Sequence, residues 1–349
     1  MKSVAELWEG IKQSLRQPFS ALTIPADHTD QKKEEIDEEF EPDRHYFVVR
    51  INEMYLAAQR KWFSVIDPVV FVTSEFIYDK KEQTVPFIVG PGLLQKGQPV
   101  PQGMLFKDTR VAGILPYRGG RLTLSVVLCQ MAVSNPVRQL LRVVERTASA
   151  LDLSILLSSY VKVAGAVLDG FETLLGLEGT QPLIGMREEL DPEGGDRFTP
   201  RFWALINQQD VDPQSLWVRD QELVRGKSLL GATPYRDADF VLYSLTRPPK
   251  NKRTDISTLS FYPLWERVEQ EAGSGEKAYE LAKADMASLY LTIKASPDLT
   301  VPQKEALVED FKARMVAAQQ GAKDIQSLGA GPAPELDRLR EEALAILKM

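Results

Sequence analysis

The order of strand-like and helix-like patterns is the feature that most constrains the fold of this chain. Phe47, Val49 and Ile51 alternate with Val48, Arg50 and Asn52, which is the period of a half-buried strand. Strand patterns continue to about residue 133, a helical pattern follows over 136–176, and strand patterns return before a helical end. Because helices do not separate successive strands, this order predicts an α+β fold. We expect an antiparallel β-rich core interrupted by two long helices, with a helical C-terminal region.

Composition and turn signals divide the chain into five parts. Residues 24–44 are dense in acid and poor in apolar side chains, which is typical of a flexible segment. The sequence RPPKNKR at 247–253 separates the second strand block from the helices that follow. The five parts are an amphipathic helix at 1–23, an acidic flexible tether at 24–44, a β-rich core at 45–250 with a helical insertion at 136–176, a helical region at 251–328, and a linker with a terminal helix at 329–349. Periodicity does not determine whether the two strand blocks share one sheet.

Both predicted terminal helices carry an apolar stripe at helical spacing. The stripes consist of Val4, Leu7, Trp8, Ile11 and Leu15 at one end, and of Leu336, Leu339, Ala343, Ile346 and Leu347 at the other. Such a stripe must be buried on the body of the protein, on a partner or on a membrane surface. The sequence leaves these three possibilities open for both helices.

Charge and cysteine content indicate which partners and which compartment to expect. The chain has 42 basic and 49 acidic residues, a formal charge of −7, so nucleic acid is not an expected partner. The single cysteine, Cys129, forms no disulfide within the chain and fits a reducing compartment. The N-terminus lacks the continuous apolar stretch of a signal peptide. The longest uncharged run, 122–137, is shorter than the roughly 20 apolar residues of a spanning helix. We therefore expect a cytoplasmic protein without a membrane anchor.

Few residues are available for catalysis. There are two histidines, with His28 in the acidic segment and His45 at the start of a strand, so a histidine-dependent triad or a multi-histidine metal site is not expected. Cys129 lies in the run SVVLCQMAV, whose strand faces are mainly apolar, and is predicted to lie in the core. Asp237 and Asp239 would point to one face of an extended backbone and could hold a divalent ion, although aspartates before a strand are also ordinary turn residues. We expect no metal and no cofactor.

These observations favour a function based on surfaces rather than on chemistry. The leading hypothesis is a non-enzymatic adaptor or regulatory protein that presents its terminal helices to a protein partner or to a second copy of itself, in the helix-in-groove mode. One alternative is a membrane-active effector that is released by cleavage or binding at the acidic tether. The other alternative is a metal-dependent hydrolase that uses Asp237 and Asp239.

Overall fold

The structure is a computed structural model that divides into two compact units. It describes residues 4–15, 18–31, 36–57, 66–90, 104–132, 139, 141, 143, 157–177, 179–248 and 251–329. Unit 1 consists of Met1–Thr258 together with Pro297–Thr300. Unit 2 consists of Leu259–Ser296 and Val301–Met349.

Unit 1 contains two antiparallel sheets. The first has the order β1-β8-β12-β2-β5, and the second has the order β4-β3-β6-β7. The strands of the first sheet are β1 (Ser20–Thr23), β8 (Arg201–Ile206), β12 (Phe240–Thr246), β2 (Tyr46–Tyr55) and β5 (Met104–Pro116). Those of the second sheet are β4 (Lys81–Val89), β3 (Ile66–Tyr78), β6 (Leu122–Ala132) and β7 (Thr180–Leu190). Because β2 pairs with both β5 and β12, the two strand blocks of the sequence share one sheet.

The inner faces of the two sheets form the main core of unit 1. The alternating residues Phe47, Val49 and Ile51 of β2 point into it and are at most 1% exposed. They join apolar residues from β3, β4 and β6 of the other sheet in one cluster. Trp203 and Tyr243 stack within this cluster, with ring centroids 5.2 Å apart. The arrangement is a β-sandwich, and it confirms the predicted antiparallel β-rich core.

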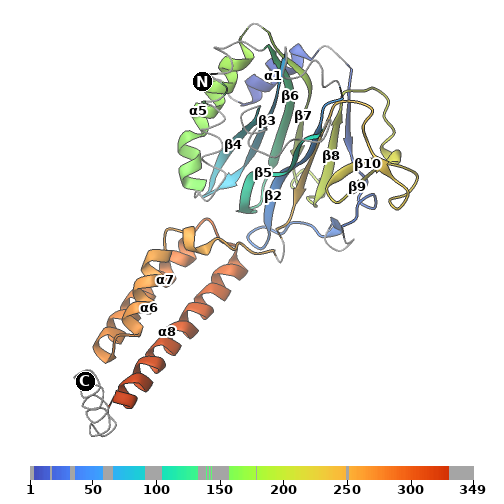
Figure 1. Cartoon of the computed structure of the whole chain (residues 1–349). Helices are drawn as coiled ribbons and strands as arrows, with labels where there is room; N and C mark the ends of the chain where they lie inside the picture. Colours follow the sequence, from blue (N-terminus) through green and yellow to red (C-terminus); the bar gives the residue numbers. More distant parts are fainter. Residues whose placement is uncertain are drawn as a thin grey trace, which may run out of the picture. The chain divides into compact units, whose positions relative to one another are not determined.

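Each outer face of the sandwich is covered by further elements of the chain (Figure 1). Helices α1 (Val4–Ser14) and α5 (Leu157–Leu175) lie on the four-stranded sheet. A small sheet of β9 (Leu216–Arg219), β10 (Glu222–Arg225) and β11 (Thr233–Pro234), preceded by the short helix η1 (Pro213–Ser215), covers part of the five-stranded sheet. Helix α5 is the second of the two predicted long helices. Most of the first one, together with the loop after β4, lies outside the described residues.

The acidic segment differs from its prediction as a flexible tether. In its described part, Ile24, Ile36 and Phe40 are 2–4% exposed and pack onto unit 1. His28 stacks on Trp217 with ring centroids 3.8 Å apart, and its Nδ1 donates to the carbonyl of Leu216 at 2.8 Å. Isolated apolar residues therefore anchor a segment whose average composition is that of a disordered one, and residues 24–31 and 36–44 form a strap along the sandwich.

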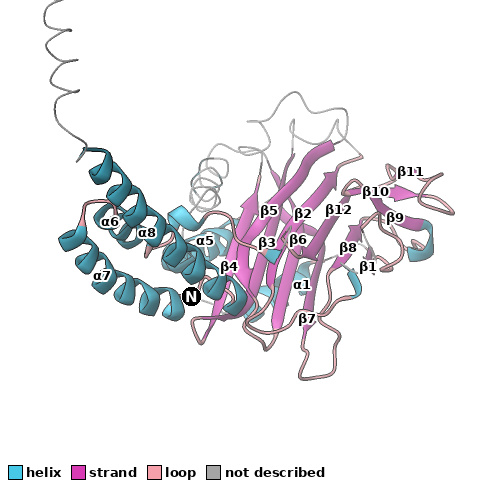
Figure 2. Cartoon of the chain, turned by 90° about the horizontal axis from the view of Figure 1, so that it is seen from below, coloured by secondary structure: helices cyan, strands magenta, loops and turns pink. Residues whose placement is uncertain are grey.

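Unit 2 consists of three helices in its described part, α6 (Tyr262–Ala272), α7 (Glu276–Ala295) and α8 (Val301–Gly329). The three helices pack against one another (Figure 2). Trp265 of α6 stacks on Phe311 of α8 at a centroid distance of 4.0 Å, and Met286 and Leu289 of α7 are buried. This unit confirms the predicted helical C-terminal region.

A buried polar cluster holds the turn between α7 and α8 within unit 1. The hydroxyl of Tyr78 donates to Asp298 at 2.8 Å, and the backbone N–H of Thr300 donates to the hydroxyl of Tyr46 at 3.0 Å. The guanidinium of Arg253 lies 3.6 Å from Asp298. Burial, followed by the charge of Asp298, raises the pKa of Tyr78 well above its ordinary value. The cluster therefore fixes Pro297–Thr300 by one charge-assisted hydrogen bond at Asp298, one neutral hydrogen bond at Thr300 and the ion pair with Arg253. The short helix η3 (Ile256–Thr258) begins three residues after Arg253.

Candidate functional site

The N-terminal stripe, predicted as a partner-binding surface, lies against the body of unit 1. Val4, Leu7 and Trp8 are 9% exposed and Ile11 is 2% exposed, while Leu15 is half-buried. Leu7, Trp8 and Ile11 belong to the apolar cluster between α5 and the outer face of the four-stranded sheet. Of the three possibilities left open by the sequence, this is burial on the protein itself. In this conformation the stripe is not available to a partner.

Gly185 of β7 makes room for the docked helix. A Cβ atom at this position would lie 3.3 Å from Cη2 of Trp8 and 3.3 Å from Cγ2 of Val127. These contacts are tighter than ordinary van der Waals contact, so glycine allows the indole to approach the strand closely. The position of α1 therefore depends on a residue about 180 positions later in the chain.

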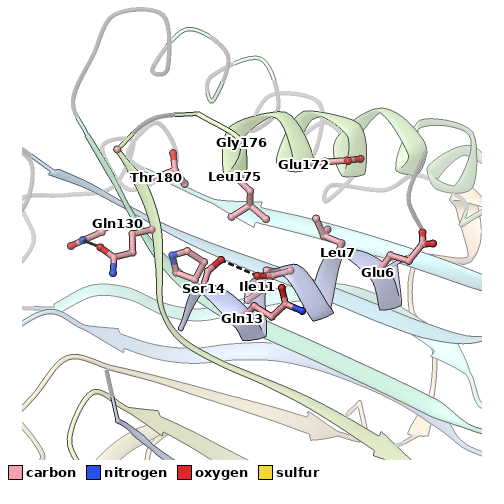
Figure 3. A pocket seen from close by; sticks show the side chains of 14 residues that line it. Glu6, Leu7, Ile11, Gln13, Ser14, Gln130, Glu172, Leu175, Gly176 and Thr180 are labelled. Carbon is pink, nitrogen blue, oxygen red and sulfur yellow. Dashed lines mark hydrogen bonds between the residues drawn. The ribbon is translucent and has the colours of Figure 1, made fainter. Parts of the chain in front are cut away.

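A groove of about 630 Å³ runs between α1 and α5 (Figure 3). Leu7, Ile11 and Leu175 supply its apolar part, and Glu6 and Glu172 lie at one end. Most of the remaining lining is polar, and several of these groups already bond to one another or to the backbone. Ser14 Oγ donates to the carbonyl of Gly10 at 2.9 Å, and Gln130 Nε2 donates to Gln181 Oε1 at 2.9 Å. The hydroxyl of Ser14 is thus engaged by the backbone of its own helix.

The two aspartates considered as metal ligands each have a protein partner. Asp237 Oδ2 accepts a hydrogen bond from Arg225 at 2.6 Å, and Asp239 Oδ1 accepts one from the backbone N–H of Ala57 at 2.7 Å. Among the residues that the structure describes, no group of three or more His, Cys, Asp or Glu side chains is placed to hold a metal ion. The geometry gives no support to a hydrolytic metal centre at Asp237 and Asp239.

A second hollow, which the sequence did not indicate, lies beside the outer face of the five-stranded sheet. It has a volume of about 570 Å³, and its lining includes Arg50 and Asn52 of β2, Gln221 of the β9–β10 turn, and the pair formed by Arg247 and Glu38. Asn52 is 1% exposed and its Nδ2 donates to Gln221 Oε1 at 3.0 Å. The lining residues come from segments far apart in the chain, so no local sequence pattern connects them.

His45 lies beside Glu38, one of the residues that line this hollow. Burial lowers the pKa of His45 most, and the charge of Arg247 lowers it further. The charges of Glu38 and Glu41 raise the pKa but do not offset the lowering. Its Nδ1 accepts a hydrogen bond from the backbone N–H of Glu41 at 2.9 Å. The proton of the neutral ring is therefore on Nε2, which lies 3.8 Å from Glu38. These contacts tie the strap to β2.

Cys129 is confirmed as a core residue. It is 0% exposed and free, and it lies in the cluster that also holds Trp8. Burial raises the pKa of its thiol to about 12. A thiol with this pKa is almost entirely protonated at neutral pH and is a poor nucleophile.

The exposed apolar side chains gather on unit 2. Seven large apolar residues are exposed among the described residues, and five of them belong to α7 and α8, namely Leu281, Tyr290, Leu291, Val301 and Val316. Leu281 and Leu291 are the most exposed of the five, at 62% and 67%. The exposed residues Ala284 and Ser288 lie between them at helical spacing. Leu281, Ala284, Ser288 and Leu291 thus form one strip along α7, which we call the α7 face.

The predicted C-terminal stripe of Leu336, Leu339, Ile346 and Leu347 lies outside the described residues. No described helix is both long and apolar enough to cross a bilayer. Searches against known proteins give no relative, since no family model, no curated protein and no solved structure matches the chain.

Proposed function

We propose that this chain is a non-enzymatic adaptor or regulatory protein, and that the α7 face binds an amphipathic helix of a protein partner. The observation that carries the proposal is the uneven distribution of exposed apolar side chains. Unit 1 covers its sheets with α1, α5 and the small β9–β11 sheet, whereas unit 2 leaves Leu281 and Leu291 more than half exposed. A grouped set of exposed apolar residues is typical of an interaction surface.

The shape of the α7 face suits a helix better than an extended peptide. Leu281 and Leu291 are ten residues apart, which is roughly 15 Å along the helix axis. The small residues Ala284 and Ser288 between them allow the backbone of another helix to approach closely. A partner helix with apolar residues at i, i+3 and i+7 would place its side chains over these small residues.

This proposal changes the surface, but not the class of function, that the sequence favoured. The stripe of α1 is occupied by unit 1, so the helical unit supplies the partner surface instead. We place the protein in the cytoplasm, because a single unpaired cysteine fits a reducing compartment. The hydrolase alternative depended on Asp237 and Asp239, and both side chains have protein partners. The membrane-effector alternative depended on a free acidic tether, and the described part of that segment packs on unit 1.

The test compares three forms of the full chain as bait in a lysate of the source cells. Leu281→Glu/Leu291→Glu places two charges in the α7 face, and Ala306→Glu/Ala313→Glu adds the same charges at exposed positions of α8. We expect a partner that wild type and control both capture, that the α7 variant loses, and that binds purified wild-type chain in isothermal titration. If every protein captured by wild type is captured equally by the α7 variant, the proposal is wrong.

A further inference from the structure

We infer that the α7 face is covered, in the absence of a partner, by the C-terminal segment 335–347 of the same chain. The segment would occupy the proposed binding face when no partner is bound. That it competes with a partner rests on the proposed function. It is argued from the exposed surface of unit 2, from the length of chain after α8, and from the spacing of apolar residues in the two segments.

The α7 face holds the two most exposed large apolar side chains of the three helices in their described part, Leu281 and Leu291. On α6 the exposed positions include Glu266, Arg267 and Gln270. On α8 many of the exposed positions carry charged residues in ion pairs, such as Lys312 with Glu309 at 2.9 Å. Val316 and several alanines of α8 are exposed as well. Leucine offers a packing segment more apolar area than alanine or valine, which favours the α7 face.

The chain after α8 has the length to reach this face. Lys304 Nζ donates to the carbonyl of Lys294 at 2.8 Å, so the end of α7 and the start of α8 lie at one level. Helix α8 has 29 residues and α7 has 20. Helix α8 thus continues for about nine residues, roughly 13 Å, beyond the start of α7. Residues 330–334 can span roughly 17 Å when extended, which returns residue 335 to the start of α7.

The apolar residues of the two segments match in spacing. Leu336, Leu339, Ala343 and Ile346 follow one another at intervals of three, four and three residues. The members of the α7 face, Leu281, Ala284, Ser288 and Leu291, have the same intervals. A segment that returns along α8 runs parallel to α7, so these residues align pairwise and the small side chains of Ser288 and Ala343 meet at the centre. A parallel pair of helices with this match can pack in register.

A disulfide test in the full chain examines this alignment. Ser288→Cys/Ala343→Cys places two thiols where small residues are expected to meet, within the 4.4 to 6.8 Å of Cα separation that a disulfide accepts. Ala306→Cys/Ala343→Cys is the matched control, with the first thiol on an exposed position of α8. Cys129 remains in both variants, because it is buried. Dilute protein is treated with oxidised glutathione and analysed by intact mass and by non-reducing electrophoresis.

We expect the first variant to form a disulfide within one chain, and the control to form none. A disulfide that links two chains would assign the face to the segment of a second copy and overturn the inference. Equal crosslinking in both variants, or none in either, would overturn it as well.

A labelling experiment does not depend on the exact register. The thiol of Ser288→Cys is labelled with a maleimide in the otherwise unchanged full chain and in a chain that also carries Leu339→Glu/Ile346→Glu. Because a reagent reaches a covered thiol only through local opening, we expect labelling to be about tenfold faster in the second chain. Equal rates would contradict the inference.

The two proposals fail in different ways. If the disulfide forms within one chain but no partner depends on the α7 face, the inference stands and the proposed function fails. If a partner depends on the α7 face but the segment does not cover it, the proposed function stands and the inference fails.

Discussion

Replacement of Trp8 by alanine tests whether the N-terminal helix is a structural part of unit 1. The indole is 9% exposed and lies against Gly185 of β7. Truncation of a buried tryptophan to alanine costs about 3 to 5 kcal/mol in a closed core. We expect the lower end, about 3 kcal/mol, because grooves on both sides of α1 allow the helix to detach instead. For a unit of this size the loss lowers Tm by roughly 6 to 12 °C.

Cys129 provides a direct assay of this change. It lies in the same apolar cluster as Trp8, and burial raises the pKa of its thiol to about 12. Reaction with Ellman's reagent under native conditions therefore requires opening of the cluster. A loss of about 3 kcal/mol accelerates the reaction by roughly a hundredfold, since 1.4 kcal/mol corresponds to tenfold. The measurement is the rate of thiol release in wild type and in Trp8→Ala.

The matched control is Glu9→Ala in the same helix. Glu9 lies 3.7 Å from Lys12 and both side chains are more than 60% exposed, so the pair contributes less than about 0.5 kcal/mol. We expect Glu9→Ala to leave both Tm and the thiol rate close to wild type. If Trp8→Ala changes stability no more than this control does, α1 is not held by its apolar stripe and the assignment of the stripe to the core is wrong.

Three further changes have defined outcomes. Asp298→Ala removes an acceptor of the Tyr78 hydroxyl beside Arg253 and should cost about 3 kcal/mol in denaturant unfolding; a loss under about 0.5 kcal/mol would contradict the buried cluster. Gly10→Ala meets nothing within 4 Å and should raise Tm through helix propensity worth about 1 kcal/mol; a lower Tm would mean that the groove is filled. Burial raises the pKa of Glu53, so the folded state holds its proton more tightly than the unfolded state and stability falls as pH rises from about 4.5 through the raised pKa. The Tm of Glu53→Gln relative to wild type should therefore increase over this range, and a constant difference would argue against the shift.

The elements whose apolar residues repeat at a regular strand or helix spacing were predictable from the sequence. Strands β2, β3, β4, β6, β8 and β12 follow runs with β-branched or aromatic residues, and α5, α7 and α8 follow apolar stripes. Strand β7 was not predicted, because Pro182, Gly185 and its charged end hide the alternation. Its place is set by pairing with β6 and by the fit of Trp8 on Gly185. These are contacts between distant segments, which periodicity does not contain.

The strap shows why composition alone misassigned the acidic segment. Its carboxylates are balanced by arginines from other parts of unit 1, with Glu38 paired to Arg247 and Glu39 to Arg197. Phe40 packs beneath the guanidinium of Arg247, whose carbon lies 4.9 Å from the ring centroid. An average over residues 24–44 does not reveal these pairs, because the partners lie about 150 to 210 positions further along the chain.

The candidate site was only partly predictable for the same reason. The sequence indicated apolar stripes on terminal helices, but not which of them the body of the protein would cover. Trp8 and Ile11 find a matching surface on the four-stranded sheet. Leu281 and Leu291 were not singled out, because burial of Met286 and Leu289 on the opposite side of α7 explains the amphipathic pattern of that helix by itself.

The central claim is that the α7 face binds the C-terminal segment of the same chain as it would bind a partner helix, and a binding titration tests it most directly. A fluorescent peptide of residues 333–349 is titrated with the full chain in which Leu339→Glu/Ile346→Glu disables the internal segment, and anisotropy is recorded. The account predicts saturable binding that Leu281→Glu/Leu291→Glu weakens at least about tenfold, equivalent to 1.4 kcal/mol, and that Ala306→Glu/Ala313→Glu leaves unchanged. The absence of saturable binding, or equal binding to all three chains, would contradict it.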